Sequence, residues 1–261
     1  MFNNSEFYKR AVVALIFAPL MIILPLNGKI FFMPFILFIT YLGSQEIYKM
    51  LKLKYSLFYS VIPVVATSFL YFRGVSESLT FSLVSFIIIS IISIFDEDSI
   101  IKNITATTLS LLYVGIFSML SIPIIDKFGG EFIVLIFITI WSTDTFAYLG
   151  GVAYGKNKLC PKVSPKKSIE GSITGLLMSV VSVSIFGYYN GAISVKEGIL
   201  LSVLLSVSGQ IGDLFESKLK RECNVKDSSS IIPGHGGILD RFDSFLFAVP
   251  TLYVYLYFFK Q

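Results

Sequence analysis

The sequence predicts an all-α polytopic membrane protein with about nine transmembrane helices, on the strength of its composition and hydropathy. Of the 261 residues, 54% are hydrophobic and only 15% are charged, whereas a soluble domain carries about 25% charged residues. The mean hydropathy is +0.77, and apolar segments recur at close to the ~20 residues that cross a bilayer as a helix. These observations favour a single integral membrane domain over residues 1–261 and exclude a large soluble core.

Nine apolar segments are the candidate membrane helices. They are residues 11–26, 30–48, 57–72, 79–95, 104–125, 132–152, 173–189, 196–217 and 244–259. The first segment follows Lys9 and Arg10 as a signal peptide would, but no small-residue cleavage pattern comes after it, so we expect a retained helix. We divide the single domain into N-terminal spans, about 11–125, and a catalytic part, about 132–261.

Basic residues predict how the helices are oriented. With the N-terminus in the cytoplasm, sixteen of the 21 lysines and arginines fall on the cytoplasmic side, as the positive-inside rule requires. The long polar loops 153–172 and 218–243 then share that face. They contain Cys160 and Cys223, which have neither a disulfide framework nor a metal-ligand spacing and are expected to be reduced. The sequence thus predicts a multi-pass protein of the cell (inner) membrane, with a polar site at its cytoplasmic boundary.

An aspartate near the end of the eighth apolar segment is the first candidate for chemistry. Asp213 arrives before that segment is long enough to cross a bilayer of ~30 Å. If the helix continues, Asp213, either Glu216 or Ser217, and Lys220 share one face, because residues three or four apart are neighbours. This favours a carboxylate that lines a cytoplasmic cavity; the alternative is a solvated, charged end of the helix.

Two further aspartates stand where the ninth segment begins. Asp240 and Asp243 share a face if the helix has started there. Mg²⁺ is usually held by one or two carboxylates together with substrate phosphates and water, so Asp213, Asp240 and Asp243 are the candidate ligands. Capping of the helix by acidic residues is the alternative, and it accounts for one aspartate but not for the interposed Arg241.

The run from Pro233 to Gly237 is too flexible for a helix. Gly236 and Gly237 let backbone N–H groups approach a phosphate closely. An ordinary turn is the alternative, and a histidine such as His235 is more often a hydrogen-bonded loop residue than a catalyst. No set of cysteines and histidines suits zinc.

A second polar region surrounds the sixth segment. Asp144 interrupts that apolar run, and an acidic residue inside a membrane is a functional candidate. Further on, Ser164, Lys166 and Lys167 precede the next helix, where lysines and free N–H groups can hold a polyphosphate. The alternative for the two lysines is ordinary positive-inside charge or contact with anionic lipid.

The run from Ser217 to Asp243 resembles, without a gap, the signature of the phosphatidate cytidylyltransferases, or CDP-diacylglycerol synthases. The matching positions are Ser217, Lys220, Arg221, Lys226, Asp227, Ser229, His235, Gly236, Gly237, Asp240, Arg241 and Asp243. The segments Trp141–Tyr148 and Ser164–Gly171 are also similar to that family, so the resemblance covers roughly residues 135–250. One departure is Ser168, where threonine is expected.

The resemblance implies the reaction of CTP with phosphatidic acid to give CDP-diacylglycerol and pyrophosphate in phospholipid biosynthesis. It also implies Mg²⁺, alone or with a second ion, and a homodimer among membrane lipids, with no nucleic acid partner. The expected catalytic residues are Asp144, Asp213, Lys220, Arg221, Asp240 and Asp243. The expected substrate-binding residues are Ser164, Lys166, Lys167, Lys226, Asp227, His235, Gly236, Gly237 and Arg241.

The residue types suit this reaction. A phosphate monoester is already ionised at neutral pH, so the transfer needs positioning and charge neutralisation more than a strong base. Two other activities remain open: a CTP-dependent kinase acting on a polyprenol or similar alcohol, and a transporter with Asp144 and Asp213 on an ion path. The match from His235 to Asp243 weighs against the kinase, and the lack of an internal repeat weighs against the transporter.

Overall fold

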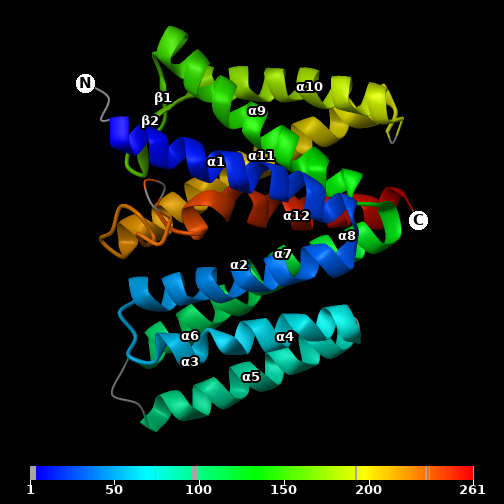
Figure 1. Cartoon of the computed structure of the whole chain (residues 1–261). Coiled ribbons are helices and arrows are strands. Elements are labelled where there is room, and N and C mark those ends of the chain that lie inside the picture. Colours follow the sequence, from blue (N-terminus) through cyan, green and yellow to red (C-terminus); the bar gives the residue numbers. More distant parts are fainter. Residues whose placement is uncertain are drawn as a thin grey trace.

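The computed structural model is a bundle of helices with one short β-hairpin (Figure 1). It describes residues 4–73, 75–95, 99–191, 193–232, 234 and 236–260. His235, expected to bind substrate, lies outside the described residues. The helices run back and forth along nearly one direction, so that the connections gather at the two ends of the bundle (Figure 1).

The N-terminal half of the chain contributes the first set of helices. They are α1 (Asn4–Leu26), α2 (Lys29–Met50), α3 (Ser56–Tyr59), α4 (Val61–Phe72), α5 (Val75–Phe95), α6 (Ile100–Thr108), the π-helix η1 (Leu109–Ile116), α7 (Phe117–Met119) and α8 (Ser121–Phe128). The last four follow one another as one long apolar stretch, Ile100–Phe128. α2 packs against both η1 and α4 in this half.

The C-terminal half contains the polar loops. Its elements are α9 (Glu131–Tyr154), β1 (Lys158–Cys160), β2 (Ser164–Ser168), α10 (Ile169–Asn190), α11 (Val195–Glu222) and α12 (Leu239–Phe259). α10 packs along α9, and α12 packs along α11. α9 and α10 approach closely at Gly175, where a Cβ atom would lie 2.5 Å from the backbone oxygen of Thr143. Small residues allow such close approach between membrane helices.

The prediction of a helical, multi-pass membrane protein is confirmed. Within the described residues, six helices are long and apolar enough to cross a membrane, and three shorter apolar helices occupy Leu15–Leu26, Ser56–Phe69 and Leu79–Phe95. Large apolar side chains remain exposed on their outer faces, for example Ile173 and Leu177 on α10. A helix suits this setting because it satisfies its own backbone hydrogen bonds in the absence of water.

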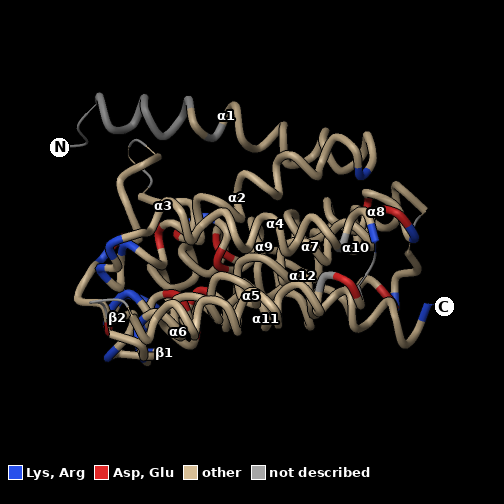
Figure 2. Tube along the Cα trace, turned by 90° about the horizontal axis from the view of Figure 1, so that it is seen from below, with Lys and Arg blue, Asp and Glu red and all other residues tan. Residues whose placement is uncertain are grey.

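The two polar loops differ in detail from the prediction. Residues 153–172 are not purely loop, because β1 and β2 pair there as an antiparallel hairpin with Lys158 opposite Ser168. The loop predicted at 218–243 is shorter, since α11 ends at Glu222 and α12 already begins at Leu239. Both loops lie at the same end of the bundle (Figure 1), where many lysines and arginines gather, and several acidic residues lie further inside (Figure 2).

Candidate active site

Two cavities meet at the loop end of the bundle. The first, of about 420 Å³, is lined by α9, α10, α11 and both strands of the hairpin. The second, of about 460 Å³, is lined by α1, α9, α11, α12 and the loop between α11 and α12. Asp144 on α9 and Asp213 on α11 belong to the lining of both. The predicted aspartates Asp240 and Asp243 line the second cavity.

Asp213 is held in place by partners from two elements. Because α11 continues for 28 residues, Asp213 and Ser217 share a helix face, and the Ser217 hydroxyl donates to Oδ1 of Asp213 at 3.3 Å. The Lys167 ammonium, which comes from β2, forms an ion pair with Oδ2. The hairpin thus brings one predicted cation onto one predicted carboxylate across 46 positions of sequence.

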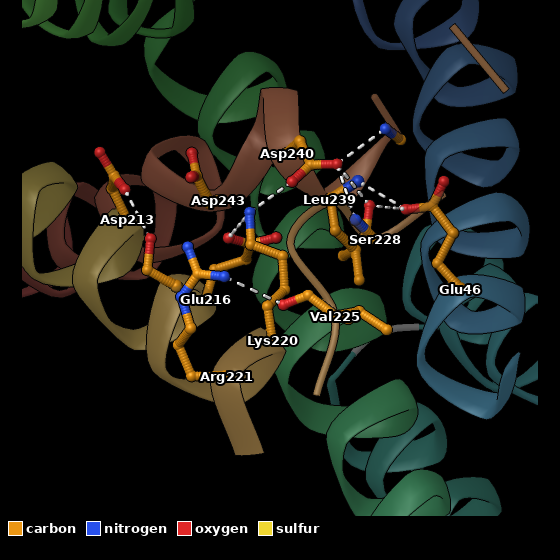
Figure 3. Close-up of polar contacts among 12 residues, drawn as sticks. Glu46, Asp213, Glu216, Lys220, Arg221, Val225, Ser228, Leu239, Asp240 and Asp243 are labelled. Atoms are coloured by element: carbon orange, nitrogen blue, oxygen red, sulfur yellow. Dashed lines mark hydrogen bonds and ion pairs between the residues drawn. The ribbon is translucent and has the colours of Figure 1, made fainter. Parts of the chain in front are cut away.

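Lys220 lies between two buried carboxylates (Figure 3). Its Nζ is 2.7 Å from Oε2 of Glu216, which is fully buried on the same helix. It also pairs with Oδ1 of Asp240 from α12. Only 11% of the Lys220 side chain is exposed. This lysine therefore neutralises protein carboxylates in the structure and ties α11 to α12.

Asp240 accepts hydrogen bonds with both of its oxygens. Oδ1 pairs with Lys220, and Oδ2 accepts from the backbone N–H groups of Ser228 at 2.9 Å and Gly237 at 2.8 Å. The Ser228 hydroxyl lies 2.9 Å from the same oxygen. Asp240 thus holds the loop that precedes α12 (Figure 3).

The carboxylates of Asp243 and Asp144 accept fewer described hydrogen bonds than that of Asp240. Oδ1 of Asp243 accepts from the backbone N–H of Ser244 at 2.6 Å, and Asp144 is exposed to the two cavities that it lines. No group of three His, Cys, Asp or Glu side chains among the described residues is arranged to hold a metal ion without further ligands. A carboxylate pair fits Mg²⁺ all the same, because this ion takes most of its ligands from phosphates and water.

Other predicted residues surround the second cavity or lie apart from it. Lys226, Asp227, Gly236 and Arg241 line an open polar hollow of about 470 Å³, which shares Asp227 and Arg241 with the second cavity. Lys166 lines the first cavity with Lys167.

Three predicted residues take other positions. Arg221 is exposed, and its Nη1 donates to the backbone oxygen of Val225 at 3.3 Å. Ser164 stands at the start of β2, and Gly237 is buried against Glu46.

Two polar residues of this region were missed by the sequence reasoning. Glu46, on α2, is fully buried and accepts hydrogen bonds from the loop before α12. Gln210, on α11, lines the first cavity and accepts a hydrogen bond from Ser172 of α10. The signal for Glu46 was present, since it is an acidic residue inside an apolar segment.

The fold and the site are those of a helical membrane protein with carboxylates and cations gathered where two cavities meet. The chain belongs to the cytidylyltransferase family, whose model matches residues 8–259.

Several relatives are similar to the chain over nearly all of its length. A phosphatidate cytidylyltransferase of Bacillus subtilis (strain 168) is 34% identical over 263 residues, which cover 95% of this chain and 97% of that protein. The enzyme of the same name from Staphylococcus saprophyticus is 34% identical over 94% of this chain and 96% of its own. The phosphatidate cytidylyltransferase of Thermotoga maritima is 31% identical over 81% of this chain and 82% of its own length. These findings confirm the family that the Ser217–Asp243 run predicted.

Proposed function

We propose that the protein transfers CMP from CTP to phosphatidate. A phosphate oxygen of phosphatidate forms a bond to the α-phosphorus of CTP, the bond from that phosphorus to the β-phosphate bridging oxygen breaks, and pyrophosphate leaves with the electron pair. The observation that carries the proposal is that Asp144 and Asp213 line both cavities. Substrates bound in the two cavities therefore meet at these carboxylates. Family membership over residues 8–259 supports the same reaction.

The first cavity suits the lipid substrate. Ala147, Val152 and Leu159 make one side of it apolar, whereas Lys166 and Lys167 supply cations at β2. On the outer face of α9, Val152 is 72% exposed, so an acyl chain can approach from the bilayer. An apolar wall with a cationic end matches a lipid phosphate.

The second cavity suits CTP. It continues into the polar hollow that contains Lys226, Ser229 and Arg241. Arginine can bind two phosphate oxygens in a planar fork, and lysine acts as a compact point charge. The glycine-containing loop adds backbone N–H groups of the kind that approach phosphates.

Magnesium fits the carboxylates that line the second cavity. Asp213 and Asp243 are the ligands that we propose. Asp213 accepts from one donor at each oxygen, Ser217 and Lys167, and Asp243 accepts from the N–H of Ser244, so each carboxylate keeps free acceptor sites. When bound, the ion would neutralise charge on the phosphates. Both oxygens of Asp240 are engaged by Lys220 and by the loop, so ligation by Asp240 stays a prediction that requires Lys220 to move.

Orientation and assembly complete the proposal. Sixteen of 21 basic residues favour the loop end as the cytoplasmic one, and CTP is a cytoplasmic nucleotide. We further propose that the protein works as a homodimer in the cell membrane, as the family resemblance implies.

The deciding experiment uses purified protein in detergent with phosphatidate and CTP, labelled at either the α- or the γ-phosphate. Cytidylyl transfer places only the α-label in the lipid and releases the γ-label as pyrophosphate. A lipid that carries the γ-label instead, when a polyprenol is supplied, would establish a kinase. Absence of turnover with both acceptors would contradict the proposal and leave a transporter.

A further inference from the structure

Glu46 lies in the N-terminal half of the chain yet contacts the loop that carries the signature residues. It is on α2 (Lys29–Met50), and it is fully buried. Its carboxylate faces the loop between α11 and α12 and the first turn of α12 (Figure 3). Its partners stand more than 180 positions further along the sequence.

Both oxygens of Glu46 are saturated by donors from that loop. Oε1 accepts from the Ser229 hydroxyl at 2.6 Å and from the backbone N–H of Ile238 at 2.9 Å. Oε2 accepts from the Ser228 hydroxyl at 2.8 Å and from the backbone N–H of Leu239 at 2.9 Å. Hydrogen bonds to an ionised acceptor are about twice as strong as neutral ones.

These bonds supply the cap that α12 lacks. The residue in the N-cap position, Ile238, has no side chain that can accept a hydrogen bond. Glu46 accepts from the N–H groups of Ile238 and Leu239 instead, and its charge is favourable at the positive end of the helix dipole. The start of α12, and with it the position of Asp240 and Asp243, is therefore defined by a side chain of α2.

A glycine gives independent evidence that this contact is tight. A Cβ atom at Gly237 would lie 2.0 Å from the Ser228 hydroxyl oxygen and 2.4 Å from Oε1 of Glu46. The loop backbone thus lies directly against the carboxylate, with no room for any side chain. The Ser228 hydroxyl is also within 2.9 Å of Asp240, so its single proton serves one of the two carboxylates at a time.

We infer that Glu46 is a positioning residue for the transfer reaction: it sets the loop 223–238 and the first turn of α12 so that Asp243 and Arg241 face the second cavity. Glu46 itself lines none of the cavities found in the described part of the chain. The inference rests on the proposed function, because it takes Asp243 as part of the reacting site.

The test compares Glu46→Gln with Gln45→Ala. Glutamine keeps the size of Glu46 but turns an N–H₂ group towards backbone donors. Gln45, next to it on α2 and also buried, accepts a hydrogen bond from Lys49 of its own helix and, within the described residues, makes none to the loop. Its replacement therefore perturbs α2 without removing a bond to the loop. For Glu46→Gln we expect kcat to fall on the order of 10- to 100-fold, as for reacting groups misplaced by about 1 Å.

Two readouts separate positioning from a loss of folded protein. A misplaced carboxylate raises the Mg²⁺ concentration needed for half-maximal activity, whereas a smaller folded fraction lowers kcat without moving that concentration. Trypsin should also cut faster after the exposed Lys226 in Glu46→Gln than in the wild type, at an unchanged Tm. Ser228→Ala, which removes one donor to Glu46, should shift both readouts in the same direction if Glu46→Gln does not fold.

The results for Glu46→Gln either support or overturn the positioning role of Glu46. Wild-type kcat, Mg²⁺ dependence and cleavage rate in Glu46→Gln would overturn the inference, as would a lower kcat accompanied only by a lower Tm. Asp243→Asn, measured in parallel, distinguishes a failure of the proposed active site from a failure of the role of Glu46. If Asp243→Asn is fully active, the proposed site fails; if Asp243→Asn is inactive while Glu46→Gln behaves as wild type, only the role of Glu46 fails.

Discussion

Three aspartates that look equivalent in sequence have different surroundings in the structure. Asp240 is bound by Lys220 and by the loop backbone, whereas Asp213 and Asp243 face cavities and accept from one or two groups each. A carboxylate whose acceptors are all taken by protein donors is suited to hold structure, and one with free acceptor sites is suited to bind a cation. The three residues should therefore respond differently to substitution.

Asp213→Asn and Asp243→Asn should each abolish turnover without unfolding the protein. Loss of one group that stabilises charge in the transition state typically costs on the order of 10²- to 10³-fold in rate. The measurement is kcat/KM with saturating Mg²⁺, together with Tm. Asp126→Asn is the control, since Asp126 pairs with Lys29 through a half-exposed side chain and should keep its activity. Near-wild-type turnover of either site variant would remove that aspartate from the catalytic assignment.

Lys167→Ala tests which cavity takes the lipid. The ammonium lies in the first cavity beside Asp213, so its loss should raise KM for phosphatidate more than KM for CTP. We expect a cost well above the ~1 kcal/mol of a surface ion pair. The opposite order of effects, with KM for CTP raised more, would exchange the substrates between the two cavities.

Arg221→Lys should impair turnover if Arg221 moves onto a phosphate, because lysine loses the planar fork.

Lys220→Ala should destabilise the protein far more than Lys218→Ala. Lys220 is buried between Glu216 and Asp240, and its removal leaves two buried carboxylates without their cation. Breaking a buried pair by removing one partner costs about 3–5 kcal/mol. Lys218 pairs with Glu222 at 3.0 Å through exposed side chains, which contributes at most ~1 kcal/mol. Tm of both variants in the same detergent checks the difference, and equal shifts would contradict the role of Lys220.

At the scale of elements, the hairpin and the helix pair α9–α10 together shape the first cavity. β2 carries Lys166 and Lys167 to it, and the Ser168 side chain then caps α10 by accepting from the N–H of Gly171 at 3.1 Å. α9 supplies Thr143 and Asp144. Because α9 and α10 touch near these residues, the width of the cavity depends on how closely the two helices approach.

Gly175→Ala should separate these helices. The added methyl group would meet the backbone oxygen of Thr143 at 2.5 Å, and overpacking of a close contact costs about 1–3 kcal/mol. We expect a lower Tm and a lower kcat, since Asp144 follows Thr143. Gly198→Ala is the matched control, because a Cβ atom there makes ordinary contacts of 3.4 Å or more. The expectation fails if both variants keep wild-type Tm and activity.

At the scale of the whole molecule, two free cysteines report which side of the membrane the loops face. Cys160 ends β1, and Cys223 follows α11. Burial, and after it the charge of Glu222, raises the pKa of the Cys223 thiol, so this thiol reacts better at alkaline pH. In intact cells, a membrane-impermeant thiol reagent should leave both unlabelled, and permeabilisation should expose them. Cys160→Ser and Cys223→Ser identify the labelled site, and labelling of either in intact cells would reverse the orientation.

The sequence alone determined the class and the family of the protein, and it predicted which residues carry its chemistry. Composition and apolar runs of membrane length predict helical spans, because a bilayer forces backbone hydrogen bonds to be made within each segment. The cost of charged residues near lipid marks the run from Ser217 to Asp243 as a candidate site, and its gap-free resemblance to the family signature predicts the family. Helical spacing predicted a shared face for Asp213, either Glu216 or Ser217, and Lys220. The contacts of Asp213 with Ser217 and of Glu216 with Lys220 agree with it, because such relations are local.

Only the tertiary structure decided the partners of these residues. Spacing along α11 could not show that Lys220 is neutralised by Asp240, that Lys167 reaches Asp213 from a hairpin, or that Glu46 caps α12. These contacts join different elements over 20, 46 and 193 positions of sequence. They exist because the packing of the helices brings buried charges to the few groups that can satisfy them. Local sequence limits which residues can do chemistry, whereas long-range packing determines which of them face a substrate and which hold the others in place.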